Sequence, residues 1–314
     1  MGKNLVKTID NINAEDFEIN PLLNKLRENP VAGKGEAHYF VSFDETRIFY
    51  RVWRPQKQVN KIIIVSHGMA GHGEFFVLLA DKIISEGIMV VVPDYRNHGR
   101  SEGEKGDLKK FKNILQDLKE FVNYIGSQYP NITIFLLGES MGGAVNANFV
   151  ADYPENISGL ILFSPAVKLN FSWAMKLGLG LVMLPFLVLR VCYPSAKLIP
   201  AKGREEQGIA NPIHQQYDKT DPYHLDKVSI RYLLQLFKYI RKSIKKAKKI
   251  SIPTLIFQGT EDPGVSPEGV AEFYEKLESN DKSLFLIEGG YHCLITDPLF
   301  RDKWHYLIDW LKSH

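Results

Sequence analysis

Residues 132–147 constrain the fold more than any other part of the chain. An apolar, β-rich run ends at Leu137, the pentapeptide Gly138-Glu139-Ser140-Met141-Gly142 follows, and small, helix-compatible residues come next. A strand, then G-x-S-x-G, then a helix is the layout of a nucleophile elbow, a sharp turn that exposes its serine. The flanking glycines avoid clashes in such a turn, and the start of the helix directs N–H groups at developing negative charge. The stretch therefore predicts Ser140 as a nucleophile.

Strands and helices alternate along most of the remaining chain. This alternation specifies a parallel sheet covered by helices on both faces, and the first two strands, separated by a short polar break, form a hairpin. The 314 residues, 45% of them hydrophobic, are sufficient for one large core. We expect strands at 37–43, 46–53, 61–66, 88–92, 132–137, 157–163, 254–257 and 283–287 and helices at 75–86, 108–129, from the elbow to 153, 228–249, 267–277 and 299–311.

The alternation is interrupted once, between residues 166 and 226, where we expect an apolar stretch and polar loops. We interpret 166–226 as a cap inserted into one α/β core formed by 37–165 and 227–314. Residues 1–36 are polar and irregular, with one weakly amphipathic piece around Phe17 to Leu26, and are expected to form a lead-in.

An elbow serine needs a base and an orienting acid, which in this topology follow in the order Ser, Asp or Glu, His. Both belong on loops after strand C-termini, where open α/β sheets bind ligands. Asp262 follows the strand at 254–257, and His292 follows the strand at 283–287. We therefore predict Asp262 as the acid, with Glu261 as its rival, and His292 as the base.

Two backbone N–H groups should form the oxyanion hole. One is expected from Met141, which follows the nucleophile, and one from Met69, in the loop after the strand at 61–66. We assign the side chain of His67 to fixing that loop. His72 and His98 lie in no compact His/Cys/Asp pattern, so we predict no metal site and no cofactor.

These motifs, in this order, resemble those of the monoacylglycerol lipase and lysophospholipase group of α/β-hydrolases, also described as serine-aminopeptidase-like. The resemblance covers residues 37–312. The residues that carry it are His67-Gly68 with Gly71, Asp94-x-x-x-His98-Gly99-x-Ser101-Glu102-Gly103, Gly138-x-Ser140-Met141-Gly142-Gly143, Ser164-Pro165, Gly259-x-x-Asp262 and Gly290-x-His292.

The resemblance implies a mostly parallel, eight-stranded sheet with an inserted helical cap, and an esterase acting on a single acyl chain. It carries the triad over to Ser140, Asp262 and His292 and the oxyanion donors to Met69 and Met141. One departure is Glu139, where these lipases usually have His. Its negative charge beside the nucleophile leaves the fine substrate preference open.

The cap contains an apolar run, residues 171–193, whose only charges are Lys176 and Arg190. The uncharged part is shorter than the roughly 20 residues of a membrane span, and Pro185 interrupts it. Two interpretations stay open: a cap helix packed on the core, or a lid that lines an acyl tunnel and dips into a lipid interface. The residues expected to contact the acyl chain are Leu177, Leu181, Leu184 and Phe186.

Basic residues gather in the helix predicted at 228–249, where they form either a solvated face or a contact with anionic lipid headgroups. The net charge of +3 and the absence of a recognised module disfavour nucleic-acid binding. With two cysteines and no signal-peptide core at the start, we expect a cytoplasmic protein with peripheral membrane contact through the cap. The basic residues are Lys238, Arg241, Lys242, Lys245, Lys246, Lys248 and Lys249.

The predicted function is hydrolysis of a monoacylglycerol or a lysophospholipid through an acyl-enzyme. A peptidase or amidase and a carboxylesterase for small esters remain alternatives. A dehalogenase or epoxide hydrolase would need a carboxylate in place of Ser140, and a non-catalytic binding protein would be expected to lack a member of the triad.

Overall fold

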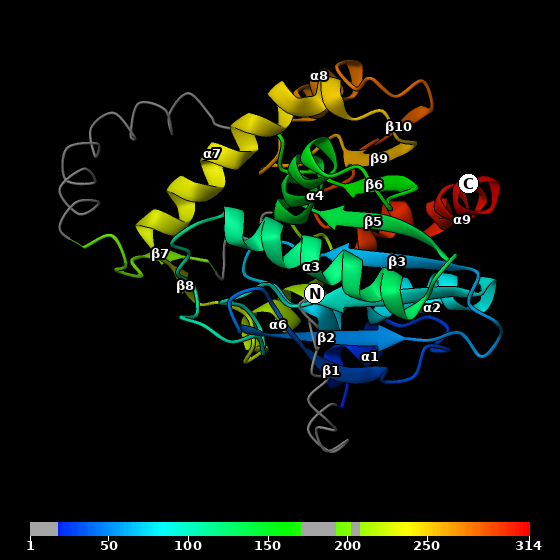
Figure 1. Cartoon of the computed structure of the whole chain (residues 1–314), viewed down its shortest axis with the longest axis horizontal. Coiled ribbons are helices and arrows are strands. Elements are labelled where there is room, and N and C mark those ends of the chain that lie inside the picture. The colour runs from blue at the N-terminus through cyan, green and yellow to red at the C-terminus, as the bar shows by residue number, and fades with distance from the viewer. Residues whose placement is uncertain (1–17, 171–192, 202–207) are drawn as a thin grey trace, which may run out of the picture.

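The computed structural model describes residues 18–170, 193–201 and 208–314 (Figure 1). Eight strands form one sheet in the order β1-β2-β4-β3-β5-β6-β9-β10. Neighbours from β4 to β10 are parallel, whereas β1–β2 and β2–β4 are antiparallel. The strands are β1 (Glu36–Val41), β2 (Arg47–Trp53), β3 (Lys61–Ser66), β4 (Ile88–Pro93), β5 (Thr133–Glu139), β6 (Gly159–Phe163), β9 (Thr254–Gly259) and β10 (Lys282–Ile287). The predicted mostly parallel α/β sheet and its first hairpin are confirmed.

Helices cover both faces of this sheet, as Figure 1 shows. One face packs against α3, α4, α7 and α8, and the other against α1, α2 and α9. The central strands are buried on both faces, because continuous apolar runs suit a sheet sandwiched between helices. The helices are α1 (Pro21–Leu26), α2 (Val77–Ile83), α3 (Lys112–Gln128), α4 (Met141–Asp152), α6 (Pro212–Thr220), α7 (Ile230–Lys246), α8 (Pro267–Glu275) and α9 (Trp304–Ser313).

Two predicted helices are divided. The helix expected at 75–86 is α2 with a short 3₁₀ segment at each end, η2 (Gly73–Phe76) and η3 (Ile84–Glu86). The helix expected at 299–311 begins as the 3₁₀ segment η7 (Pro298–Lys303) and becomes α9. The remaining 3₁₀ segments are η5 (Ala247–Lys249) and η6 (Leu294–Thr296).

The insertion contains a helix, α6, where the alternation of strands and helices indicated only an apolar stretch and loops, although the resemblance implied a helical cap. Asn211 caps α6, accepting hydrogen bonds from the N–H groups of Ile213 and His214, and Pro212 occupies its first turn. Both are ordinary helix-start signals. At the base of the insertion, β7 (Ile199–Pro200) pairs with β8 (Lys227–Val228).

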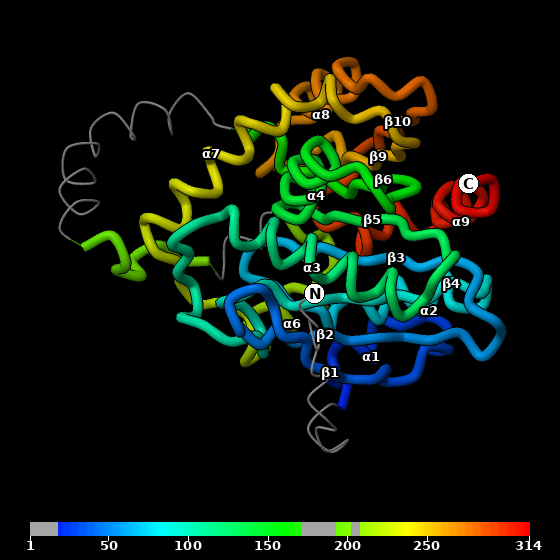
Figure 2. Tube along the Cα trace, in the orientation of Figure 1, coloured from blue at the N-terminus to red at the C-terminus, as the bar shows by residue number. Residues whose placement is uncertain are grey.

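The lead-in is not wholly irregular either. Its helix α1 packs against α6, and Leu23 within it is fully buried. The N-terminal lead-in therefore contacts the segment that we interpret as the cap. Figure 2 shows the trace of α7 running from the β7–β8 end of the molecule to α8. Within the described ranges, no helix has the length and apolar character needed to cross a bilayer.

Candidate active site

Ser140 lies between β5 and α4 with φ 51° and ψ −115°. A positive φ is strained for a residue other than glycine and occurs where a turn must present a side chain sharply. The elbow also lies close to β3, because a Cβ on Gly142 would collide with the carbonyl oxygen of Ser66. The glycine therefore lets the start of α4 approach β3.

Asp262 and His292 meet at the ends of β9 and β10. Asp262 Oδ2 lies 2.7 Å from His292 Nδ1, while its Oδ1 accepts hydrogen bonds from the N–H groups of Gly264 and Val265. Asp262 is 2% exposed, whereas Glu261, the rival acid, is exposed. The geometry thus pairs the histidine with Asp262.

The charges of this pair reinforce each other. Burial would raise the pKa of Asp262, but attraction to His292 and its hydrogen bonds lower it overall. Burial would lower the pKa of His292, but attraction to Asp262 and their hydrogen bond, with the charge of Glu139, raise it overall. An ionised carboxylate on Nδ1 leaves Nε2 as the atom that can accept a proton.

Of the two predicted oxyanion donors, Met69 lines the same cavity as Ser140, and Met141 directly follows Ser140 in the chain. Met141 is the first residue of α4, where N–H groups lack an intrahelical acceptor. Met69 lies in the turn after β3, beside the loop that His67 ties down. The ring of His67 donates from Nδ1 to the carbonyl of Gly68 at 2.8 Å and accepts at Nε2 from Tyr95 N–H at 3.0 Å. This is the loop-fixing role expected from the sequence.

One cavity of about 240 Å³ contains Ser140, His292 and Met69. Its remaining wall combines apolar residues with an unexpected group of acids and histidines. The predicted acyl-contact residues Leu177, Leu181, Leu184 and Phe186 lie outside the described residues. The lining residues are His67, Gly68, Met69, Gly71, His72, Phe75, Phe76, Glu139, Ser140, Ala201, Gly208, His214, Asp218, His224, Pro263, Gly264, His292 and Cys293.

Sequence spacing missed this polar wall, because three of its members, His214, Asp218 and His224, lie in the insertion. Among the described residues, His72, Asp221 and His224 form the one group of three potential metal ligands that lie close together. His72 Nε2 already lies 3.0 Å from Asp221 Oδ1, which also accepts from Tyr223 N–H at 2.8 Å. We interpret His72 and Asp221 as a buried pair that joins the loop after β3 to the insertion.

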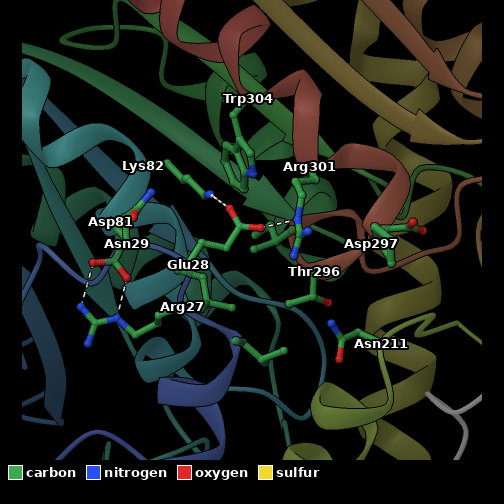
Figure 3. A pocket seen from close by; sticks show the side chains of 14 residues that line it. Arg27, Glu28, Asn29, Asp81, Lys82, Asn211, Thr296, Asp297, Arg301 and Trp304 are labelled. Atoms are coloured by element: carbon green, nitrogen blue, oxygen red, sulfur yellow. Dashed lines mark hydrogen bonds and ion pairs between the residues drawn. The ribbon is translucent and has the colours of Figure 1, made fainter.

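A second cavity, of about 280 Å³, lies beside α1 and α2 (Figure 3). Most of its charged groups pair with one another: Arg27 binds Asp81 at 2.5 and 2.7 Å, and Glu28 binds both Lys82 and Arg301. Asp297 accepts hydrogen bonds from the N–H groups of Tyr291 and Leu299. No serine, cysteine or histidine is among the described residues that line it. We therefore assign a structural role to this second cavity.

Comparisons with known proteins identify the family of the chain. Residues 57–299 match the family described as serine aminopeptidase, S33. The chain is 29% identical over 262 residues to monoglyceride lipase of Rattus norvegicus, covering 82% of this chain and 83% of the relative. It is 30% identical over 275 residues to the monoglyceride lipase homolog of Monkeypox virus, covering 86% and 96%.

Among solved structures, a soluble variant of monoglyceride lipase from Saccharomyces cerevisiae, in complex with a substrate analogue, superposes with a TM-score of 0.79. That match covers 89% of this chain and 95% of the other at 23% identity, and it supports the fold. Because the family match extends over most of the sequence, the chain belongs to the serine aminopeptidase S33 family, as an α/β-hydrolase similar to monoglyceride lipases.

Proposed function

We propose that this serine hydrolase, which acts on esters, cleaves lipids with a single acyl chain through Ser140, His292 and Asp262. The observation that carries the proposal is the 2.7 Å contact between Asp262 and His292, beside a cavity that also contains the strained elbow serine. The names of the relatives favour a monoacylglycerol as the substrate. A lysophospholipid remains the second lipid candidate.

The reaction proceeds through an acyl-enzyme. His292 Nε2 takes the proton of Ser140 Oγ as this oxygen attacks the ester carbonyl carbon. The N–H groups of Met69 and Met141 stabilise the resulting oxyanion. His292 then gives the proton to the leaving alcohol as the ester C–O bond breaks.

Water completes the cycle. His292 takes a proton from water as it attacks the acyl carbon, and returns it to Ser140 Oγ when the fatty acid leaves. Asp262 holds the proton on Nδ1 and stabilises the imidazolium in both halves of the reaction. All of these steps use groups of the chain and water alone.

Replacement of the nucleophile tests this proposal. Ser140→Ala should lower kcat on p-nitrophenyl esters and monoacylglycerol by about 10⁴–10⁶-fold, since triad members act as a unit. The same variant should lose labelling by a fluorophosphonate probe, and circular dichroism should show an unchanged fold. A Ser140→Ala protein that keeps its activity would end the assignment.

Two alternatives have specific readouts. A peptidase or amidase would cleave aminoacyl-amide substrates at rates comparable to esters of the same size. A carboxylesterase for small esters would prefer acetyl or butyryl esters to long-chain ones.

We further propose peripheral contact with lipid surfaces through the cap, with α7 contributing its basic face. Residues 171–192 of the cap lie outside the described residues, so the support comes from α7. Its exposed cations include Lys238, Arg241 and Lys245, and no acidic residue occurs between 230 and 250. Anionic headgroups attract each nearby Lys or Arg by about 1 kcal/mol.

A further inference from the structure

Tyr232 lies in the first turn of α7, directly after the insertion rejoins the core, and its side chain is fully buried. This turn is held from two sides. Ser229 caps the helix by accepting a hydrogen bond from Tyr232 N–H at 3.1 Å, and the Ser229 hydroxyl donates to Asp107 Oδ1 at 2.5 Å. Because the cap and Asp107 fix the turn, the tyrosine ring has a defined position relative to the core.

The hydroxyl of Tyr232 joins two residues from different parts of the core. It lies 3.2 Å from Met141 Sδ and 2.9 Å from His98 Nε2. His98 Nδ1 lies 3.0 Å from the carbonyl oxygen of Arg96, and burial lowers the pKa of His98 to about 4, so the ring is neutral near pH 7. We therefore place its one proton on Nδ1, which donates to Arg96, and this leaves Nε2 as an acceptor for the tyrosine hydroxyl.

The contact with Met141 acts on the first predicted oxyanion donor. Met141 is the first residue of α4, and it is 1% exposed. A methionine side chain has three rotatable bonds, so a fixed neighbour at its sulfur selects one conformation. An oxyanion donor is effective only when it is placed to within about 0.5 Å. Tyr232 therefore helps to hold the turn from which the Met141 N–H must point.

The contact with His98 acts on the loop of the second predicted donor, Met69. The ring of His98 lies edge-on to the ring of His67, with 5.4 Å between the ring centroids. His67 is the residue that ties down this loop through the carbonyl of Gly68. Both rings are buried, and close-packed interiors transmit displacements. A shift of His98 would therefore reach the loop that contains Met69.

The hydroxyl of Tyr232 thus contacts residues that support both donors. We propose that Tyr232 is a positioning residue of the oxyanion hole, which holds Met141 directly and the Met69 loop through His98. This inference rests on the proposed function, because Met69 and Met141 are the donors of that reaction. The role is one of placement, since Tyr232 is not among the described residues that line the cavity beside Ser140.

Tyr232→Phe tests the role, because it removes the hydroxyl and keeps the ring. Loss of a whole oxyanion donor lowers kcat by about 10²–10³-fold, so displaced donors should lower kcat on 1-oleoylglycerol by about 10–100-fold and leave KM nearly unchanged. Inhibition by a long-chain trifluoromethyl ketone is the second readout. Ser140 Oγ adds to its carbonyl carbon, the serine proton passes to His292, and the hemiketal oxygen carries the negative charge. The inhibition constant should rise by the factor by which kcat/KM falls.

Two variants control for packing. Tyr239→Phe removes a hydroxyl from the same helix, where the ring stacks on Phe111 with centroids 4.2 Å apart, and should leave kcat unchanged. Met141→Leu removes the sulfur and should lower kcat. Combined with Tyr232→Phe, it should lower kcat by less than the product of the two single losses, because both changes remove the same contact. Rates are expressed per site labelled to completion by a fluorophosphonate, so that unfolded protein does not count.

Four results would each overturn the positioning role: a wild-type kcat in Tyr232→Phe, an unchanged inhibition constant for the ketone, an equal loss in Tyr239→Phe, or losses that multiply in the double variant. The proposed function has its own test. If Ser140→Ala keeps its activity, the proposed function fails. If Ser140→Ala is inactive while Tyr232→Phe keeps the wild-type kcat, only the positioning role fails.

Discussion

At the scale of single residues, the burial of Glu139 makes stability depend on pH. Burial raises the pKa of its carboxyl group, and electrostatic interaction with the neighbouring His214 and His292 opposes that rise only in part. The carboxyl lies directly before Ser140, where its ionised form is costly.

This cost gives a pH-dependent prediction. Because the folded pKa lies above the ordinary value of 4.5, the folded protein binds more protons than the unfolded chain above that pH. The stabilisation from protonated Glu139 is complete below the unfolded pKa and is lost as pH rises through the folded pKa. Glu139→Gln, which cannot ionise, should therefore gain stability relative to wild type between pH 4 and pH 8.

Urea unfolding at several pH values measures this difference. Each unit of pKa elevation contributes about 1.4 kcal/mol to the gap at high pH. A gap that stays constant from pH 4 to pH 8 would contradict the raised pKa. Glu288→Gln, at an exposed position after β10, is the matched control and should show no such trend.

The sequence places Ser140, Asp262 and His292 at the elbow and at the ends of two strands, and the structure brings Asp262 and His292 into contact beside the cavity that Ser140 lines. Residues that only the fold brings to this cavity were missed. His224 was not predictable, because it lies 85 residues after Glu139 in a segment without regular periodicity. Because no strand or helix was predicted between residues 166 and 226, the position of His224 relative to the sheet could not be predicted.

At the scale of elements, the helices that follow a strand were predictable and α6 was missed. A buried strand fixes where the next helix must pack. A long apolar stripe such as that of α3 can therefore be recognised in the sequence as the buried face of a helix. Helix α6 has only nine residues and four polar or charged side chains in its middle. Its start signals, Asn211 and Pro212, were present, but its stability comes from packing against α1, which periodicity does not report.

At this scale, we predict that the basic face of helix α7 binds anionic lipid. If its basic face contacts lipid, the protein should bind vesicles that contain anionic phospholipid better than neutral vesicles, and added salt should weaken this binding. Arg241→Glu with Lys245→Glu should lower the vesicle partition coefficient more than tenfold, as each cation contributes about 1 kcal/mol. Co-sedimentation with vesicles measures the effect.

The control for α7 is Lys109→Glu with Lys110→Glu, an equally exposed pair of lysines before α3. If both double variants lose binding equally, net charge is responsible and not the face of α7. Equal binding of wild type to anionic and neutral vesicles would leave α7 as a solvated helix.

At the scale of the whole molecule, the N-terminal segment joins the core to the insertion. Leu23 in α1 packs in the core on the α2 side, and α1 contacts α6. Asn20 reaches both parts, through its N–H to Glu74 at 2.6 Å and its side-chain amide to Asp221 at 3.4 Å. The lead-in thus contacts Glu74 and Asp221, and Asp221 pairs with His72 in the wall of the cavity beside Ser140, a role that only the tertiary contacts reveal.

The ion pairs in Figure 3 allow this role to be measured. Arg27 binds Asp81 in α2 through two hydrogen bonds, and their side chains are 6% and 4% exposed. Removing one partner of a buried pair costs about 3–5 kcal/mol, because the other charge is left buried. Asp81 would keep its bonds from the N–H groups of Val31 and Ala32, so Arg27→Ala should destabilise the protein by about 3 kcal/mol.

Lys82→Ala provides the comparison within the same cavity. Its pair with Glu28 is 26% and 34% exposed, and Glu28 also binds Arg301, so this loss should cost less than about 1 kcal/mol. Urea unfolding of both variants tests the contrast. Asp81→Asn added to Arg27→Ala should recover part of the stability, because the stranded charge is removed. Equal costs for Arg27→Ala and Lys82→Ala would mean that the N-terminal segment is attached mainly by the apolar packing of α1 and not by its buried ion pair.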